Sequence, residues 1–254
     1  TGVGRHRPFA LGWHNGRLFV GSVDQNGTNG YVHKIDPASG AATLVLTIPL
    51  SYTRQNWLTS SNLNLPATWH SWSADPTTVS YQTSGSATET NYSQAMLTDI
   101  EFSGNDMVLG FRDRWGDQTT ANTKFRAADS KATWGDAAGD ILYACYNNNS
   151  YTLETGATGA CGNSTATNGQ TPSGPGGYEH YFWEVWEDSS TWDPSTSSGA
   201  FHWETAQGGL LQLAGNPSVM TTAMDPFNDF SGGLLKLDNA TGRREGVTTT
   251  SVSS

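Results

Sequence analysis

Three acidic loops carry residue types that could bind a metal ion. In each, an aspartate is followed closely by further oxygen-bearing side chains: Asp24, Asn26 and Asn29, then Asp113 and Asp117, then Asp225, Asn228 and Asp229. Such oxygens on glycine-bearing loops suit Ca²⁺, which takes roughly six to eight oxygen ligands. The stretch DQNGTNG from Asp24 lacks the terminal glutamate of an EF-hand loop. The loops therefore predict Ca²⁺ sites, with turn capping by each aspartate as the alternative.

A second set of polar residues precedes three apolar segments of similar pattern. Its members are His6 and Arg7, then Gln94 and Asp99, then His202, Glu204 and Thr205. If the loops that lead into the three segments converge, they predict a metal or substrate site built from separate parts of the chain. The sequence has no Gly-x-Ser-x-Gly elbow, HExxH helix, phosphate-binding loop or dinucleotide fingerprint. Enzymatic activity is therefore not predicted, although a paired-carboxylate glycosidase stays open because acids far apart in sequence can meet in space.

Tryptophans gather in the nearly uncharged segment 51–92. Trp57, Trp69 and Trp72 stand there among Asn, Ser and Thr. Aromatic rings in such a setting predict either a surface for sugar stacking or subunit docking, or a lid packed on the domain. With His202 and Glu204 they form the predicted ligand-binding set.

The elements that must position these residues follow a strand pattern that occurs three times. The first copy is Pro8–Gly40, with alternating apolar residues separated by Gly and Asn turns, and related stretches begin at Leu97 and at Gly208. Each second strand runs into an aspartate, namely Asp24, Asp113 and Asp225. Upstream of these aspartates, Trp13, Phe102 and Leu213 occupy similar positions. The pattern predicts a repeated β-meander.

Meanders of this kind predict an all-β fold, a β-propeller or partial propeller with long polar insertions. A β-sandwich with chance similarity among short strands is the alternative. We expect a single domain or a fragment of one over 1–254, with repeats near 8–50, 97–155 and 208–247 and insertions at 51–92, 114–138 and 147–177. The third strands of the first and third copies both end in an aspartate followed by a glycine, Asp36 with Gly40 and Asp238 with Gly242.

Composition narrows the classes of partner. The 254 residues contain 13 Lys and Arg against 23 Asp and Glu, a formal charge of −10. Because the cations that contact phosphates are scarce, nucleic acid and anionic membranes are not expected as partners. Cations are the more plausible small partners, and no apolar run is long enough for a membrane span. The 29 glycines and the low charged fraction of 14% are typical of loop-rich extracellular β-proteins.

Two covalent features also point outside the cell. Cys145 and Cys161 are the two cysteines of the chain, and their spacing predicts a disulfide that closes one loop, with two free buried thiols as the alternative. Five Asn-x-Ser/Thr sequons predict glycosylation if the producing cell glycosylates. They begin at Asn26, Asn91, Asn148, Asn163 and Asn239.

Four stretches carry a family resemblance: RPFALGWHNGRLFVG from Arg7, LTDIEFSGNDMVLGFRDRWGDQT from Leu97, AAGDILYAC from Ala137 and HWETAQGGL from His202. The chain resembles the propeller-like region of large bacterial secreted surface proteins that often carry SdrD B-like modules, and more loosely NHL-type blades. The resemblance implies a β-propeller, an extracellular bacterial location and a chain that is part of a larger polypeptide. It implies no catalytic residue.

The function expected from these features is that of a non-enzymatic bacterial surface, adhesive or filament-forming structural protein. We expect self-association or binding to other surface proteins through uncovered strand edges and the Thr248–Ser254 tail. The alternative is a carbohydrate-binding or carbohydrate-active propeller whose site lies on the loops that lead into each first strand.

Overall fold

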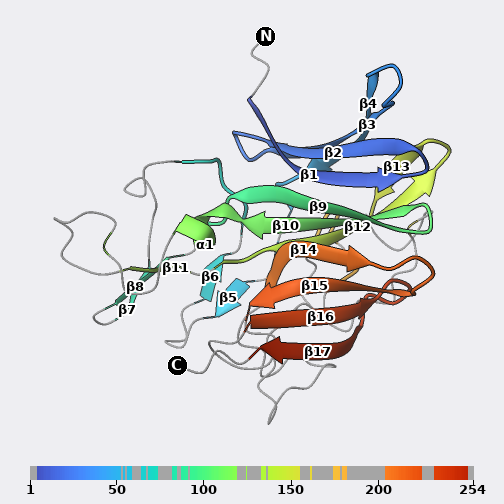
Figure 1. Ribbon diagram of the computed structural model, residues 1–254. Coiled ribbons are helices and arrows are strands. Elements are labelled where there is room, and N and C mark those ends of the chain that lie inside the picture. Colours follow the sequence, from blue (N-terminus) through green and yellow to red (C-terminus); the bar gives the residue numbers. More distant parts are fainter. Residues whose placement is uncertain are drawn as a thin grey trace.

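The computed structural model describes residues 5–52, 54, 56–58, 64–66, 68–73, 82–84, 87–90, 92–118, 124, 133–135, 137–154, 161, 174–177, 179–181, 204–224 and 232–250. These residues confirm the all-β prediction, because they form three four-stranded antiparallel sheets that lie one after another (Figure 1). No closed barrel or propeller ring is identified among the described residues, which form three four-stranded sheets in series, so the propeller or partial propeller stays a prediction.

The first sheet has a simple meander order. Its strands are β1 (His6–His14), β2 (Arg17–Asp24), β3 (Asn29–Ile35) and β4 (Ala42–Pro49). Asn15 and Gly16 join β1 to β2 with φ of 48° and 72°, the positive values that a tight two-residue hairpin turn requires. Apolar residues alternate along β2, and Phe19 and Val23 on one face are buried.

The second and third sheets repeat this order. The second contains β9 (Ala95–Ser103), β10 (Asp106–Asp113), β12 (Asp140–Asn147) and β13 (Ser150–Leu153). The third contains β14 (Ala206–Gln212), β15 (Ser218–Met224), β16 (Gly232–Asp238) and β17 (Arg244–Thr250). The helix α1 (Arg114–Gln118) follows β10, and none of the described segments forms a helix that could cross a bilayer.

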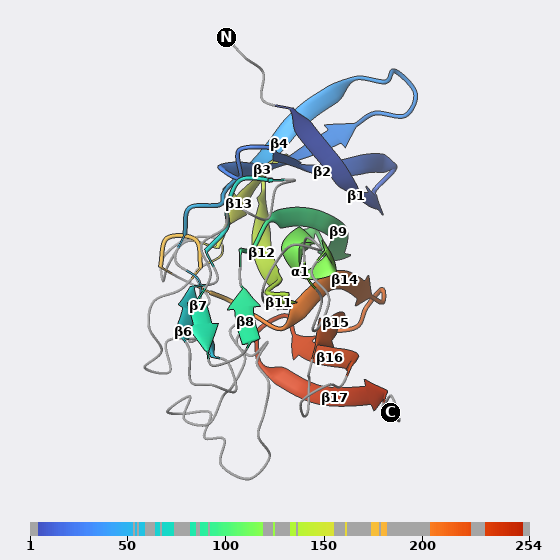
Figure 2. The same ribbon diagram turned by 90° about the vertical axis from the view of Figure 1, so that its left-hand side faces the viewer.

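Shorter strands form two small sheets. One pairs β5 (Asn56–Leu58) with β6 (Asn64–Pro66), and the other contains β7 (Gln82–Ser84), β8 (Ala87–Thr90) and β11 (Thr133–Gly135). They lie to one side of the three large sheets (Figures 1 and 2). The segments expected as insertions therefore contain strands of their own.

The predicted copies are visible in the structure. β2 and β10 end at Asp24 and Asp113, as the sequence pattern requires, while Asp225 lies outside the described residues. The turns after β3 and β16 have the same hydrogen bond, from the glycine N–H to the aspartate carbonyl, at 2.8 Å in both Asp36–Gly40 and Asp238–Gly242. The sequence pattern therefore predicted the repeat correctly at these positions.

Three details of the sequence interpretation are wrong. Gln212 rather than Leu213 occupies the position equivalent to Trp13, because Gln212 pairs with Val219 and Leu213 lies past the end of β14. The expected insertion 147–177 begins with an edge strand, β13, and the expected tail Thr248–Ser254 begins inside β17. Strand pairing outweighs local polarity in these edge strands, because each pairs along one side with an apolar neighbour.

Two apolar cores hold the three sheets together. The first lies between the first and second sheets and includes Phe19, Val32 and Ile100, and the second lies between the second and third sheets and includes Val108 and Leu235. The domain is thus stabilised mainly by packing of each sheet on the next.

Glycines at one repeated position allow the close approach of these sheets. A Cβ on Gly21 of β2 would lie 2.6 Å from the Leu97 side chain of the second sheet. A Cβ on Gly110 of β10 would lie 2.4 Å from the Gly208 carbonyl oxygen of the third sheet. Both glycines stand three residues before the aspartate that ends their strand, and Thr222 occupies this position in the third sheet.

Candidate functional site

The strand register defines a front face for each sheet. Val20 and Leu109 occupy the same position relative to the aspartate that ends their strand. Val20 pairs with Leu11, and Leu109 pairs with Ile100. Each first strand also has a register shift just before this pair. Leu11 and Ile100 are therefore equivalent residues.

Equivalent residues on the front faces differ in what covers them. Ile100 is 2% exposed because the first sheet packs on it, and its neighbour Phe102 stacks on His14 at a ring distance of 4.2 Å. Leu11 and Trp13 are each 64% exposed. The front face of the first sheet is thus uncovered, whereas the matching face of the second sheet is buried.

The uncovered face carries apolar residues from all four strands, with His33 of β3 between Val20 and Leu44. Strand pairing places Val20 beside Leu11 and Leu18 beside Trp13, and the same rows continue to Ile35 on β3 and Leu44 on β4. Leu44 is 50% exposed, and Leu18, Val20 and Ile35 are only partly buried. We call this surface, Leu11, Trp13, Leu18, Val20, Ile35 and Leu44, the front patch.

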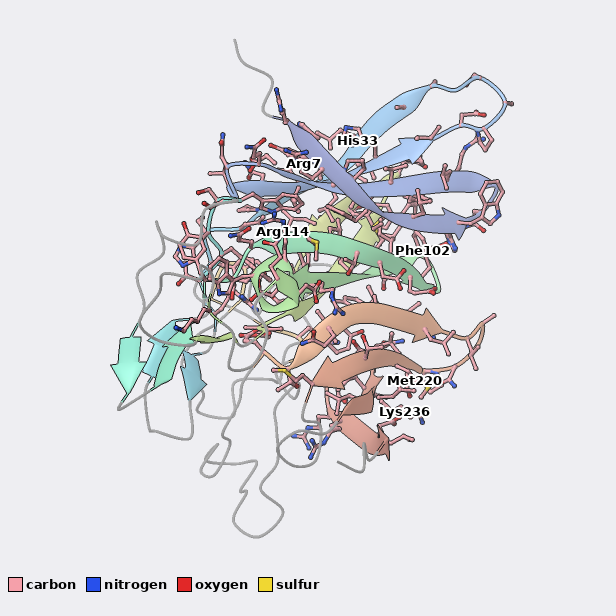
Figure 3. All side chains as sticks on the ribbon, turned by 60° about the vertical axis from the view of Figure 1, so that its left-hand side comes forward. Arg7, His33, Phe102, Arg114, Met220 and Lys236 are labelled. Carbon is pink, nitrogen blue, oxygen red and sulfur yellow. A yellow bond between two sulfur atoms is a disulfide. The ribbon has the colours of Figure 1, made fainter. Side chains whose placement is uncertain are left out.

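The opposite end of the series is more polar. The outward face of the third sheet carries Met220 and Lys236, which are paired and labelled in Figure 3, together with the exposed Thr222. Lys236 forms an ion pair with Glu245 at 2.9 Å. Leu211 and Leu213 are 47% and 55% exposed there. The two ends of the sheet series are therefore chemically different.

The first predicted Ca²⁺ loop is a hydrogen-bonded turn in the structure. The Asp24 carboxylate accepts hydrogen bonds from the Thr28 N–H and hydroxyl, both at 2.8 Å, and from the Asn29 N–H at 3.1 Å. Asn26 is exposed. These contacts match the turn-capping alternative, and Ca²⁺ binding by this loop stays a prediction.

The second predicted loop is also closed by backbone amides. Asp113 is fully buried and accepts hydrogen bonds from the N–H groups of Gln94 and Trp115, both at 2.8 Å, and of Ala138 at 3.3 Å. Burial raises the pKa of this carboxyl to about 6, although the three amide donors oppose the shift. Asp117 does not join Asp113, because it pairs with Arg112 at 2.5 Å. Asp225, Asn228 and Asp229 of the third loop lie outside the described residues.

A buried ionic cluster lies where the second and third sheets meet the segment after β4. Its centre is Arg54, whose Nη2 donates to Glu204 at 3.2 Å and to the carbonyl of Ala138 at 2.9 Å. The Nε of Arg54 lies 3.6 Å from Asp140. Burial alone would lower the pKa of Arg54, but the carboxylates of Glu204 and Asp140 raise it, so the guanidinium stays charged.

Acidic groups outnumber cations in this cluster. One oxygen each from Asp140, Glu179 and Glu204 lie within 4.8 Å of one another, and all three side chains are buried. Glu204 has φ of 61°, a left-handed conformation that disfavours side chains and is held here beside Arg54. These oxygens are ligands that hard cations prefer, and the cluster also fastens residue 54 to β12 and to the start of β14.

Sequence reasoning found only Glu204 of this cluster. Arg54 and Asp140 gave a weak signal, since Arg54 is the single cation of segment 51–92 and Asp140 directly precedes the apolar run ILYAC. Residues so far apart are brought together only by the packing of separate sheets. Their partnership could not be read from spacing.

The predicted tryptophan platform is not formed as expected. Trp69 is buried, with the Arg54 guanidinium 3.7 Å from its ring centre and its Nε1 donating to the Tyr52 hydroxyl at 3.0 Å. Trp69 therefore cannot stack on a sugar, and the lid alternative describes it. Trp72 is partly buried and lies apart from this cluster, nothing is described of the Trp57 side chain, and His202 lies outside the described residues.

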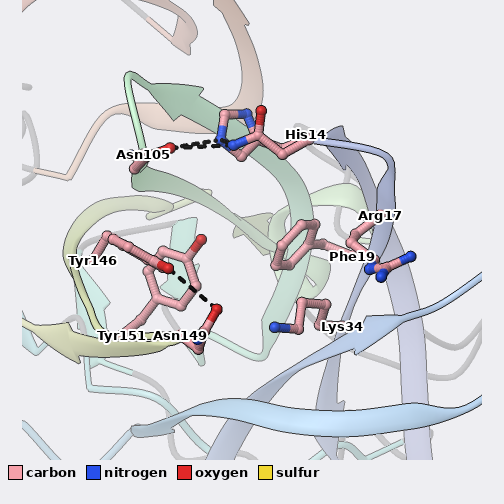
Figure 4. Close-up of a pocket in the computed structure, with 9 residues that line it drawn as sticks. His14, Arg17, Phe19, Lys34, Asn105, Tyr146, Asn149 and Tyr151 are labelled. Carbon is pink, nitrogen blue, oxygen red and sulfur yellow. Dashed lines mark hydrogen bonds between the residues drawn. The ribbon is translucent and has the colours of Figure 1, made fainter.

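A shallow hollow of about 260 Å³ opens at the turn end of the first and second sheets (Figure 4). Its polar lining includes His14, Lys34 and Asn105, with Tyr146 and Tyr151 on the other side. His14 Nε2 lies 3.2 Å from the Asn105 side-chain oxygen. The hollow holds no cluster of acid, base and nucleophile that would indicate catalysis.

The disulfide prediction is confirmed, because Cys145 and Cys161 are bonded. The sequons differ in access. Asn26 and Asn148 are exposed, whereas Asn239 is buried and donates both amide hydrogens, to Ser103 Oγ at 3.0 Å and Gln212 Oε1 at 2.7 Å. Asn239 is therefore closed to glycosylation in the folded chain. Asn91 and Asn163 lie outside the described residues.

Two curated proteins are similar to this chain over much of its length. Colossin-A of Dictyostelium discoideum is 28% identical over 242 residues, which is 93% of this chain and 2% of that protein. Colossin-D of the same organism is 27% identical over 159 residues, which is 61% of this chain and 14% of that protein. The chain thus spans a small part of both relatives. No family model matches, and no solved structure matches.

These relatives correct the expected source. The matching proteins come from Dictyostelium, a eukaryote, so a bacterial surface, adhesive or filament protein is the wrong identification, and a secreted bacterial location is equally unsupported. The resemblance to bacterial proteins with SdrD B-like modules has no support in the family comparison. The disulfide still points to an oxidising, extracellular setting.

Proposed function

We propose that this chain is a protein interaction module that binds a second copy of itself through the front patch of its first sheet. The observation that carries the proposal is the exposure of Leu11 and Trp13 at positions whose equivalents in the second sheet are packed against another sheet. Exposed contiguous apolar surfaces of this kind mark interaction sites.

The internal interfaces supply the packing rule. Twice within the chain, a front face with the register of β1 is covered by a neighbouring four-stranded sheet. The occupant of the front patch is therefore expected to be a sheet of the same kind. A second copy supplies one, and two front patches can pack on each other because their six residues are all apolar, although His33 lies between Val20 and Leu44 on the same face.

A front-to-front contact fits better than a front-to-back contact. Where sheets stack within the chain, the covering sheet presents Gly21 or Gly110 for close approach, but the third sheet presents Thr222 and Lys236 on its outward face. When two front patches face each other, neither Thr222 nor Lys236 enters the contact, and the two copies form a pair with two-fold symmetry.

The size of the patch sets the expected affinity. Four strands of seven to nine residues span a face of roughly 26 Å by 19 Å, on the order of 500 Å². Stable complexes bury about 800 Å² on each partner, so the pair should be transient. The relatives are far longer than this chain, so in them a module of this type is joined to other segments of the same polypeptide.

The test is sedimentation velocity over a range of about 5 to 500 µM. The wild-type mass should rise and level off at twice the monomer, and the double variant Leu11→Ser/Trp13→Ser should stay monomeric with an unchanged melting temperature. The matched control Leu211→Ser/Leu213→Ser alters equally apolar residues at the other end and should behave as wild type. A wild type that stays monomeric, a mass that grows beyond the dimer, or loss of pairing in the control would each refute the proposal.

A further inference from the structure

Two arginines from neighbouring sheets share one tryptophan ring. The guanidinium carbon of Arg7, on β1, lies 5.5 Å from the centre of the Trp72 ring, and that of Arg114, at the start of α1, lies 4.8 Å from it. Figure 3 labels Arg7 on the first sheet and Arg114 near the helix α1 that follows β10. The ring is held in place, because its Nε1 donates to the Ala95 carbonyl at 2.9 Å. Two cations are thus brought together beside one aromatic side chain.

Both arginines have only neutral partners among the described residues. Arg7 Nη2 donates to the Gln25 side-chain oxygen at 3.1 Å. Arg114 Nη1 donates to the Ser73 carbonyl at 3.2 Å and to the side-chain oxygen of Gln94. Burial and the neighbouring Arg7 charge both lower the pKa of Arg114.

Gln94 adds a buried donor at the same place. Its side chain is 0% exposed, and its Nε2 has no acceptor among the described residues. The amide orientation is fixed, because turning it over would place its NH₂ against the donating Arg114. Nε2 is bonded to the same carbon as the oxygen and therefore lies beside this guanidinium. The Nε of Arg7 is likewise buried without an acceptor.

We propose that Arg7, Gln94 and Arg114 bind a tetrahedral oxyanion, a phosphate or sulfate group, beside Trp72. The charged oxygens of such a ligand accept hydrogen bonds, and they match guanidinium groups from β1 and α1 together with the amide of Gln94, which directly precedes β9. The nearby Asp113 carboxylate does not occupy the site, because three backbone amides donate to its oxygens. Arg7 and Gln94 both belong to the polar set whose loops were predicted to converge. In this site they are linked through Arg114, which shares the Trp72 ring with Arg7 and donates to Gln94.

The test titrates the purified chain with inorganic phosphate and inorganic sulfate, with chloride at equal ionic strength as the reference. Binding is read from the NMR resonances of the Arg7 Nε–H and the Gln94 side-chain amide. Both should shift together and saturate with either oxyanion but not with chloride. Phosphate that binds about tenfold tighter than sulfate would identify a phosphate group as the natural ligand, and the reverse order a sulfate group.

Variants locate the site. Arg7→Gln and Arg114→Gln should each weaken binding by about tenfold or more, because each removes a charged donor. Arg7→Lys keeps the charge but loses the planar pair of donors, so it should weaken binding by a smaller factor. Arg17→Gln removes the same charge from an arginine that pairs with Asp36 at 3.0 Å, and it should bind as the wild type does. Absence of saturable shifts in the wild type, or equal weakening in Arg17→Gln, would overturn the site.

Discussion

The front faces of the first and second sheets have the same strand register and opposite surroundings. Leu11 and Ile100 occupy one position and Trp13 and Phe102 another, yet the first sheet leaves both of its residues exposed, whereas the second sheet buries Ile100 and partly buries Phe102. Residue type alone does not tell the two faces apart, since all four are large and apolar. The neighbour that each sheet meets therefore decides whether such a face is core or interaction surface.

The largest effect expected from this comparison is in stability. Ile100→Ala should lower the free energy of unfolding by about 2 to 5 kcal/mol, because it leaves a cavity between two sheets. The equivalent Leu11→Ala should change it by less than about 0.5 kcal/mol when measured at low concentration, because its side chain is in water. Urea denaturation measures both. Similar losses in the two variants would mean that the first sheet's face is covered after all.

The comparison also explains what could be predicted from sequence. Alternation of apolar residues and Gly or Asn turns marked most strands, and the aspartates at the ends of β2 and β10 set the correct register. The polar edge strands β13 and β17 were missed, because half of what stabilises an edge strand is its neighbour and not its own composition. The exposure of Trp13 could not be predicted either, since its sequence pattern matches that of the partly buried Phe102.

Functional residues were harder to predict than strands. The aspartates were singled out for metal binding because of their spacing, but the amides that satisfy Asp24 and Asp113 can be seen only in the fold. Arg54 and Asp140 lie 86 positions apart and meet only through sheet packing. The sequence singled out Arg7 and Gln94 because of their positions at the first strands, whereas Trp72, which Arg7 and Arg114 contact, was assigned to a different surface.

Burial at the end of β10 predicts a pH dependence of stability. The pKa of Asp113 rises from 3.8 to about 6 on folding, so the folded state holds this proton more tightly than the unfolded state does. The contribution of Asp113 to stability should therefore be greatest below about pH 4 and be lost as the pH rises from 4 to 6. The contribution is at most about 3 kcal/mol.

Asp113→Asn should flatten this decline, because an amide has no proton to lose. Burial raises the pKa of Glu154 well above its usual value as well, so a fall of the same sign should remain in this variant. Asp117→Asn removes one carboxyl from the exposed end of α1 and serves as the control for charge. Thermal unfolding followed between pH 4 and pH 7 makes the measurement. An Asp113→Asn profile as steep as that of the wild type would contradict the assignment.

The close spacing between sheets leads to a third prediction about covered and uncovered faces. Gly110→Ala should destabilise the fold by about 1 to 3 kcal/mol, because its new methyl group would lie 2.4 Å from the Gly208 carbonyl oxygen and force two sheets apart. Thr222→Ala alters the equivalent residue on the uncovered face of the third sheet and should change stability by less than about 0.5 kcal/mol. Chemical denaturation of both variants decides the matter. A neutral Gly110→Ala would show that the sheets do not need this close approach.

The smallest expected effects are in the turns after β3 and β16. Asp36→Ala removes a hydrogen bond from the Ala38 N–H at 2.9 Å, and Asp238→Ala removes bonds from the N–H groups of Ala240 at 3.1 Å and Thr241 at 2.7 Å. Each should cost about 1 kcal/mol, with the second slightly larger, because these are partly solvated hydrogen bonds. The double variant should be additive in urea denaturation, because the turns belong to different sheets. A strong departure from additivity would mean that the turns take part in the packing of the sheets. Additive losses would mean that only residues on the sheet faces differ in how a neighbouring sheet covers them.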